Sequence, residues 1–236
     1  MKRVIKAFSL SCMLALALAG SDAATGGMTA SESLAGKGNL FSAILFGGTP
    51  LGQRWAALRP EAEKLFPALK MKAVEDLHVT VIYIGKDWAV ENLPQLRRAM
   101  AGVISEPVRL SPEIAIIGRN RHVVVVDLKG LPQSMHDRVV RLKEELNRTG
   151  LKKPEAYDAS FRPHVTLAEA GDKPPSEEQA LQLSAFQAWI AGRLDLPTLN
   201  IVLEPAMPIQ LLLAEASRPA PTPEYITVES FLENNR

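Results

Sequence analysis

The tripeptide His-Val-Thr occurs twice in the sequence, at residues 78–80 and 164–166, each time within a run of β-branched and apolar residues. Alternate side chains of a strand point to opposite faces, so the His and the Thr of each copy share one face of a predicted strand. The apolar residues between and after them would pack behind that face: Val79, Val81, Val165 and Leu167. Each copy therefore predicts a polar pair held on a rigid strand.

The segments around the two copies repeat in the same order. Apolar strands are predicted at residues 40–46 and 122–128, helical segments at 51–69 and 132–150, and the His-Val-Thr strands at 75–85 and 161–170. The tripeptides are 86 residues apart and the preceding strands about 82. A duplicated unit of this size predicts two pseudo-symmetric lobes, with equivalent positions facing each other across a twofold axis.

The first 23 residues have the pattern of an export signal. Lys2, Arg3 and Lys6 precede an apolar stretch that ends near Ala19, and small residues suited to cleavage lie at positions 19–23. An uncleaved membrane anchor is the alternative, although the stretch is short for a span. We expect a signal peptide at 1–23, a flexible lead-in at 24–37 and one bilobal domain at 38–236. The mature protein would be periplasmic or secreted, with no stable membrane association.

Composition argues against several classes of function. The formal net charge is +1 and becomes −2 if cleavage after Ala19 removes three basic residues, so we expect no long nucleic-acid duplex as a partner. Cys12, the single cysteine, lies in the leader, which excludes disulfides and a thiol nucleophile in the mature chain. The motifs also lack the clustered ligands of hydrolytic zinc sites. We therefore expect no metal and no other cofactor.

The paired motifs resemble those of the 2H phosphoesterase superfamily. The first continues into IYIG and the second is preceded by FRP, as in the branch that contains 2′-5′ RNA ligases and 2′,3′-cyclic phosphodiesterases. The resemblance covers about Leu40 to Phe231, with closing strands in PTLNIVLE, IQLLLAEA and EYITVESFLE. It implies an α+β fold of two lobes, each an antiparallel sheet with outer helices, and an active-site cleft between them.

Two facing imidazoles suit the opening of a cyclic phosphodiester. One group must take a proton from water while another gives a proton to the leaving ribose oxygen, and imidazole does both near neutral pH. We predict His78 and His164 as this acid/base pair, with the two roles left open. Thr80 and Thr166 would donate hydrogen bonds to the phosphate oxygens.

The expected function follows from this chemistry and from the resemblance. We expect a monomeric, metal-independent phosphodiesterase, a hydrolase acting on 2′,3′-cyclic phosphate ends or short 2′-5′-linked oligonucleotides. Its partner would be a nucleotide or short RNA substrate that carries a cyclic phosphate. The alternative is a nucleotide-binding module of the same fold that turns over slowly or not at all.

Several further residues have both a functional and a structural interpretation. Arg162, on the predicted strand face of His164, could reach a phosphate, and Phe161 or Tyr83 could flank a base, whereas packing or surface roles are the alternatives. His122 and His136 are expected to be structural or solvated. The helix face at residues 143–145 is expected to be solvated, and residues 47–49 to form a turn.

Overall fold

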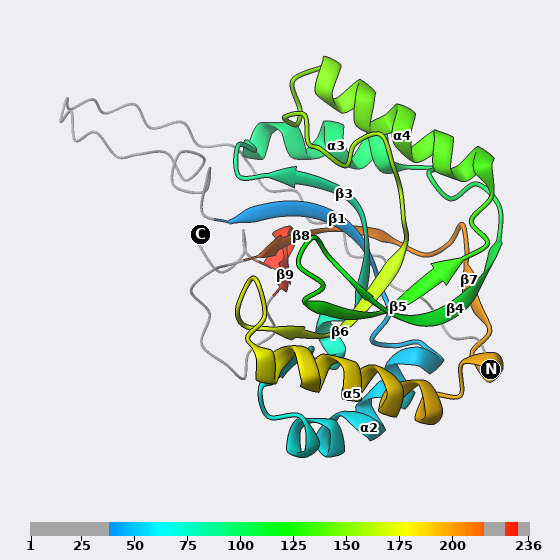
Figure 1. The fold of residues 1–236 in the computed structure, drawn as a ribbon. Coiled ribbons are helices and arrows are strands. Elements are labelled where there is room, and N and C mark those ends of the chain that lie inside the picture. The colour runs from blue at the N-terminus through cyan, green and yellow to red at the C-terminus, as the bar shows by residue number, and fades with distance from the viewer. Residues whose placement is uncertain (1–37, 215–224, 231–236) are drawn as a thin grey trace, which may run out of the picture.

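The computed structural model describes residues 38–214 and 225–230 and contains two antiparallel sheets with helices outside them (Figure 1). The strand order is β3-β1-β8-β9 in the first sheet and β2-β6-β5-β4-β7 in the second. The predicted α+β fold of two antiparallel sheets with outer helices is thereby confirmed. The predicted export signal and lead-in lie outside the described residues.

The bounds of the elements are as follows. The first sheet contains β1 (Asn39–Leu45), β3 (His78–Gly85), β8 (Ile209–Ala214) and β9 (Tyr225–Thr227). The second contains β2 (Leu69–Met71), β4 (Val108–Ile117), β5 (Val123–Lys129), β6 (His164–Ala170) and β7 (Ile201–Leu203). The α-helices are α2 (Pro50–Leu65), α3 (Leu93–Met100), α4 (Gln133–Arg148) and α5 (Glu177–Arg193). Short 3₁₀ turns are η1 (Val74–Asp76), η2 (Val90–Asn92) and η3 (Leu196–Thr198).

The duplication predicted from the sequence is visible in the strand register. Strand β1 pairs antiparallel with β3 and places Leu45 opposite His78, while β5 pairs antiparallel with β6 and places Asp127 opposite His164. Helix α2 joins the first pair of strands and α4 joins the second. Equivalent residues of the two strand–helix–strand units therefore occupy equivalent places in the two sheets.

The connecting helices cross from one sheet to the other. Helix α4 connects two strands of the second sheet but contacts β3 of the first, whereas α2 follows β1 of the first sheet and leads into β2 of the second, which it contacts. In Figure 1, α3 and α4 lie together beside the first sheet, and α2 and α5 lie together beside the second. The ion pair between Arg193 and Glu61, at 2.8 Å, joins α5 to α2. Consequently, one hydrophobic core contains residues of both repeats.

Helix α2 begins at Pro50, directly after the predicted turn at residues 47–49. It ends at Leu65, earlier than the predicted helical segment, which ran to residue 69. Thr49 is its N-cap and accepts a hydrogen bond from the Gly52 amide at 3.4 Å. A Cβ atom on Gly47 would lie 2.7 Å from the Val74 carbonyl oxygen, so this turn requires glycine. Pro60 lies inside the helix without ending it.

The expectation that residue 143 belongs to a solvated helix face is wrong. Lys143 on α4 is buried, and its ammonium donates to the Ser160 carbonyl at 2.5 Å and to that of Tyr157 at 3.4 Å. These bonds hold the segment that leads into β6 against α4. Periodicity alone missed them because the acceptors belong to a loop distant in sequence.

A β-bulge follows each His-Val-Thr tripeptide at the same place. Thr80 pairs with Ala43 but the next pair is Ile82 with Ser42, so Val81 is the extra residue of β3. In β6, Thr166 pairs with Val125 and the next pair is Ala168 with Val124, so that Leu167 is extra. A bulge shifts the alternation of side chains by one residue. As a result, Tyr83 and Glu169 return to the sheet faces that carry the histidines.

Within the ranges that the structure describes, no helix is both long and apolar enough to cross a bilayer.

We expect the Ser42 hydroxyl to stabilise the first bulge. It is buried, accepts from the Ile82 amide at 3.1 Å and donates to the Ile82 carbonyl at 3.4 Å. Ser42→Ala should lower the free energy of unfolding by about 1–2 kcal/mol, because a buried amide loses an acceptor. Ser184→Ala on α5, where the hydroxyl is exposed, is the matched control and should have little effect. Equal urea unfolding curves for the two variants would contradict this role.

Candidate functional site

Each histidine is held by a hydrogen bond of the same kind, from its Nδ1 to a backbone carbonyl. Nδ1 of His78 lies 2.7 Å from the carbonyl oxygen of Asp76, and Nδ1 of His164 lies 2.9 Å from that of Arg162. A carbonyl oxygen only accepts, so each Nδ1 carries the hydrogen and donates it. In the neutral tautomer Nε2 then holds the lone pair. Each imidazole therefore presents Nε2 as the atom that can take or give a proton.

We call the sheet face that carries each His and Thr the inner face. Side chains on the inner face of the first sheet include Phe41, Ala43, Leu45, His78, Thr80 and Tyr83, and those of the second include Val123, Val125, Asp127, His164, Thr166 and Glu169. The residues predicted to pack behind the motifs are all buried: Val79, Val81, Val165 and Leu167. The predicted sharing of one face by His and Thr follows from the register of both strands.

A chain of side-chain contacts connects the two inner faces. The Tyr225 ring of β9 lies edge-on to the His78 ring, with centroids 4.9 Å apart. The Lys72 ammonium lies 5.8 Å from the centre of the Tyr225 ring and 2.9 Å from a carboxylate oxygen of Glu169. Strands β3 and β6 also contact each other. The fold therefore brings the His78 and His164 strands to one region of the molecule.

Lys72 and Tyr225 were not predicted as site residues. Lys72 is buried just after the edge strand β2, and its amide donates to the carbonyl of the bulge residue Leu167 at 2.9 Å. The Tyr225 amide donates to the Asp76 carboxylate at 3.3 Å, which anchors β9 beside the His78 loop. Both residues reach the site through tertiary contacts, and no sequence motif marks them.

The Thr80 hydroxyl lies beside the imidazole of its own motif. Oγ1 is 3.1 Å from Nε2 of His78, and the two side chains lie next to each other on the strand face. The Phe41 ring packs against the same imidazole, with a centroid distance of 5.1 Å. His78 is thus held by a carbonyl, a hydroxyl and two aromatic rings. Its ring has little freedom to rotate.

His164 has a charged residue opposite it in the strand register, whereas His78 has an apolar one. Asp127, opposite His164 in register, is only 1% exposed, whereas Leu45 stands opposite His78. Arg162 binds Asp127 through two nitrogens, Nε at 3.0 Å and Nη2 at 2.6 Å, and the Lys129 ammonium lies 2.6 Å from Oδ2. Burial opposes ionisation of Asp127, but the hydrogen bonds from Arg162 and Lys129 outweigh it and lower the pKa of the carboxyl.

The pKa of His164 is lowered from its ordinary value of 6.5. Burial of the imidazole is the main cause, and the Arg162 guanidinium acts in the same direction. The Arg162 carbonyl and the Asp127 carboxylate oppose this shift without reversing it. His164 is consequently neutral at neutral pH, with an Nε2 that can accept a proton.

The other predicted contact residues fare differently. Strand β6 begins at His164, so Arg162 precedes the strand instead of lying on it. Its guanidinium nevertheless binds Asp127, the residue opposite His164. Tyr83 is 40% exposed on the inner face and donates to Asn39 Oδ1 at 2.7 Å. Burial and the Glu155 carboxylate raise the pKa of Tyr83. Arg162 and Tyr83 both stay candidates for substrate contact.

Phe161, which was suggested to flank a base, is largely buried. The ring is only 7% exposed and lies 5.9 Å from the Lys143 ammonium. Its face is therefore occupied by packing against α4. This burial favours a packing role for Phe161 over contact with a base.

The remaining histidines lie away from the paired motifs. His122 precedes β5, where burial lowers its pKa, and its Nδ1 has no hydrogen-bond partner among the described residues. His136 lies on α4, with Nδ1 3.2 Å from Asp137 Oδ1. Throughout residues 38–214 and 225–230, no three His, Cys, Asp or Glu side chains gather in a group that could hold a metal ion.

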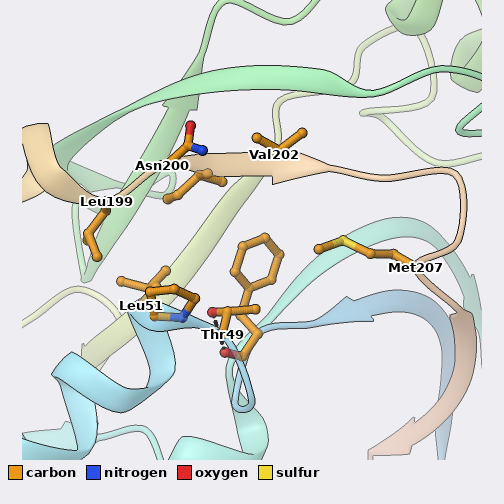
Figure 2. A pocket seen from close by; sticks show the side chains of 9 residues that line it. Thr49, Leu51, Leu199, Asn200, Val202 and Met207 are labelled. Carbon is orange, nitrogen blue, oxygen red and sulfur yellow. Dashed lines mark hydrogen bonds between the residues drawn. The ribbon is translucent and has the colours of Figure 1, made fainter.

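Two cavities lie elsewhere in the described part of the chain. One of about 70 Å³ lies between the start of α2 and β7, and Figure 2 shows its lining, which includes Thr49, Leu51 and Asn200. The other, of about 290 Å³, lies between the end of α3 and β8. Neither is lined by a His or Thr of the paired motifs.

Comparison with solved structures finds partial similarity to several proteins, one of which is described as a phosphoesterase. Escherichia coli LigT complexed with 3′-AMP is 19% identical, covers 81% of this chain and 95% of its own, and superposes with a TM-score of 0.49. TT0787 of Thermus thermophilus is 17% identical over 80% of this chain and 94% of its own, with a TM-score of 0.48. A structure described as a phosphoesterase is 18% identical over 81% of this chain and 95% of its own, with a TM-score of 0.47.

These structures are 17–19% identical to the chain and superpose with TM-scores of 0.47–0.49, so the resemblance to 2H phosphoesterases stays a prediction from the sequence. Comparison with protein-family models gives no match, and comparison with curated proteins gives none either. Identities and TM-scores this low say nothing of substrate or of residue roles. Those depend on the geometry described above.

We expect Asp127 to stabilise the segment that holds His164. At about pH 7, Asp127→Asn should lower the free energy of unfolding by about 1–2 kcal/mol, a modest value because both cationic partners are half exposed. The folded pKa of Asp127 lies below 3.8, so its contribution is complete above that pH and is lost as the pH falls through the lower folded value.

Urea unfolding of both proteins between about pH 7 and pH 3 checks this prediction. The difference should shrink toward the acidic end. Asp87→Asn is the control, because the pair between Asp87 and Lys153 is exposed on both sides. A cost no greater than that of the control at neutral pH would show that the Asp127 cluster is not stabilising.

Proposed function

We propose that this protein is a metal-independent phosphodiesterase that hydrolyses 2′,3′-cyclic phosphate ends or short 2′-5′-linked oligonucleotides. The observation that carries the proposal is the matched arrangement of His78 and His164. Each donates Nδ1–H to the carbonyl two residues earlier, presents Nε2, and has a threonine beside it on the same strand face. Two such units support proton transfer on both sides of one phosphorus.

His164 is the better candidate for general base. Its pKa is lowered, so the neutral imidazole predominates near neutral pH and Nε2 can take a proton from water. His78 would then protonate the leaving ribose oxygen. In the reverse reaction, ligation, the two roles would exchange. The sequence alone left this assignment open.

The threonine hydroxyls would stabilise the negative charge that develops on the phosphate. Thr80 and Thr166 can each donate one hydrogen bond to a non-bridging oxygen. Such donors act on charge that grows in the transition state, so they should affect kcat more than KM. In the first lobe the Thr80 hydroxyl would turn from Nε2 of His78 to the phosphate oxygen.

The cellular setting is part of the proposal. The export-signal pattern of residues 1–23 supports a periplasmic or secreted protein that meets nucleotides outside the cytoplasm. We propose that it acts as a monomer. The substrate would be a nucleotide or a short RNA end, since the charge balance of the chain does not favour a long duplex.

Loss of either motif histidine should abolish most of the activity. With a chelator present, the full chain should hydrolyse adenosine 2′,3′-cyclic phosphate, and His78→Ala and His164→Ala should each lower kcat by about 10²- to 10⁴-fold, because each removes one proton-transfer group. His136→Ala is the matched control and should retain wild-type rates, since His136 lies on the outer helix α4.

Three results would count against this proposal. Equal rates in all four proteins would remove the catalytic role of the motif histidines. Activity lost on chelation would point to a metal. Tight nucleotide binding without product would identify the protein as a binding module.

The acidic limb of the pH profile should lie below the ordinary histidine value. The base must be neutral, and the lowered pKa of His164 extends its neutral range to lower pH than 6.5. The half-maximal point of kcat/KM on the acidic side is therefore expected below pH 6.5. An acidic limb at or above that pH would assign the base role to another group.

A further inference from the structure

Arg162 and Lys129 lie side by side at the end of the inner face of the second sheet. Lys129 is the last residue of β5, and the Leu128 amide donates to the Pro163 carbonyl at 3.0 Å, so the segment before β6 stays paired with β5 at this point. Both cations bind the same carboxylate, that of Asp127. The two cations are therefore held beside the start of the His164 strand.

Asp127 neutralises only one of the two positive charges. Asp127 is 1% exposed, whereas the side chains of Arg162 and Lys129 are 54% and 46% exposed. One buried carboxylate thus holds two half-exposed cations, and Arg162 uses Nε and Nη2 for it, which leaves Nη1 for another acceptor. Glu113 lies opposite Asp127 on β4, on the side away from β6, and within the described residues it forms no ion pair with either cation.

The spacing fits two neighbouring phosphates. Lys129 lies two residues beyond Asp127 on β5, and Asp127 is opposite His164, so the cations lie one row of side chains, roughly 7 Å, from the imidazole. Successive phosphates of an extended nucleotide have a comparable separation. A phosphate held between the histidines would therefore place the next one near Arg162 and Lys129.

In the opposite direction along β6, the neighbouring cation is buried and already paired. There Lys72 is buried, binds Glu169 at 2.9 Å and lies against the Tyr225 ring. An extended substrate is thus directed toward the exposed cations.

We propose that Arg162 and Lys129 form an anion subsite that binds a second phosphate of the substrate, and that the substrate is a nucleotide carrying at least two phosphate groups, such as a short oligonucleotide end. The inference rests on the proposed function for the position of the first phosphate. Asp127 is then a positioning residue, which orients both cations and, through Arg162, the carbonyl that fixes His164.

The test compares ligands that differ by one phosphate. Calorimetry gives the Kd of adenosine 2′-monophosphate and of adenosine 2′,5′-bisphosphate for the full chain, and kinetics gives kcat/KM for adenosine 2′,3′-cyclic phosphate with and without a 5′-phosphate. The second phosphate should improve both quantities by about tenfold, the effect of one charge-assisted hydrogen bond. Added salt should reduce the gain.

Substitutions of Lys129 test whether the improvement from the second phosphate depends on the proposed subsite. Lys129→Gln should reduce it to about twofold or less, and Lys129→Arg should preserve most of it. Arg148→Gln is the control of equal charge change on the outer face of α4 and should keep the full gain. Because Arg162 still pairs with Asp127 in Lys129→Gln, that variant should fold.

The outcomes separate this inference from the proposed function. Equal affinity and equal turnover with and without the 5′-phosphate would overturn the subsite and leave the phosphodiesterase intact. A gain that Arg148→Gln reduces as much as Lys129→Gln would also overturn it, as a bulk charge effect. A Lys129-dependent preference for the bisphosphate without any turnover would support the subsite and reject the hydrolysis.

Discussion

The hydrogen bond from Nδ1 of each histidine to the carbonyl two residues earlier is the constraint on which the site depends. It requires a carbonyl that turns toward the ring at the point where the strand begins, and the chain meets this requirement differently in each lobe. Before His78 the short turn η1 ends at Asp76, and before His164 the chain passes through Pro163. Both routes select the same tautomer, with the hydrogen on Nδ1.

The two histidines share this hydrogen-bond geometry but have different neighbouring residues. Leu45 and Asp127 occupy equivalent positions opposite the two histidines, and the accepting carbonyls belong to Asp76 and Arg162, residues of opposite charge. A duplicated unit thus supplies two imidazoles of matched geometry, and the charged cluster beside His164 makes the two chemically distinct. Such a difference is what a general acid and a general base require of two identical side chains.

The sequence predicted the features that depend on local pattern. Alternation placed His and Thr of each motif on one face with valine or leucine behind, and the spacing of 86 residues between motifs and about 82 between the preceding strands matches the observed register of β3 with β1 and of β6 with β5. The two spacings differ because the segment between Asp127 and His164 is longer than the segment between Leu45 and His78.

Features that depend on tertiary contacts were not predictable. The exchange of α2 and α4 between the sheets does not follow from periodicity, which fixes the face of a helix but not its partner. The sequence pattern left Phe161 open to base stacking because its burial depends on Lys143 and the loop beside it. Lys72 and Tyr225 meet at the site from distant segments.

The most direct test of the account is a crystal structure of the full chain with adenosine 2′-monophosphate. The account predicts one phosphate between the two strands, with its oxygens within hydrogen-bonding distance of Nε2 of both His78 and His164 and of the hydroxyls of Thr80 and Thr166. A phosphate that contacts only one of the two motifs, or that binds elsewhere on the molecule, would contradict it.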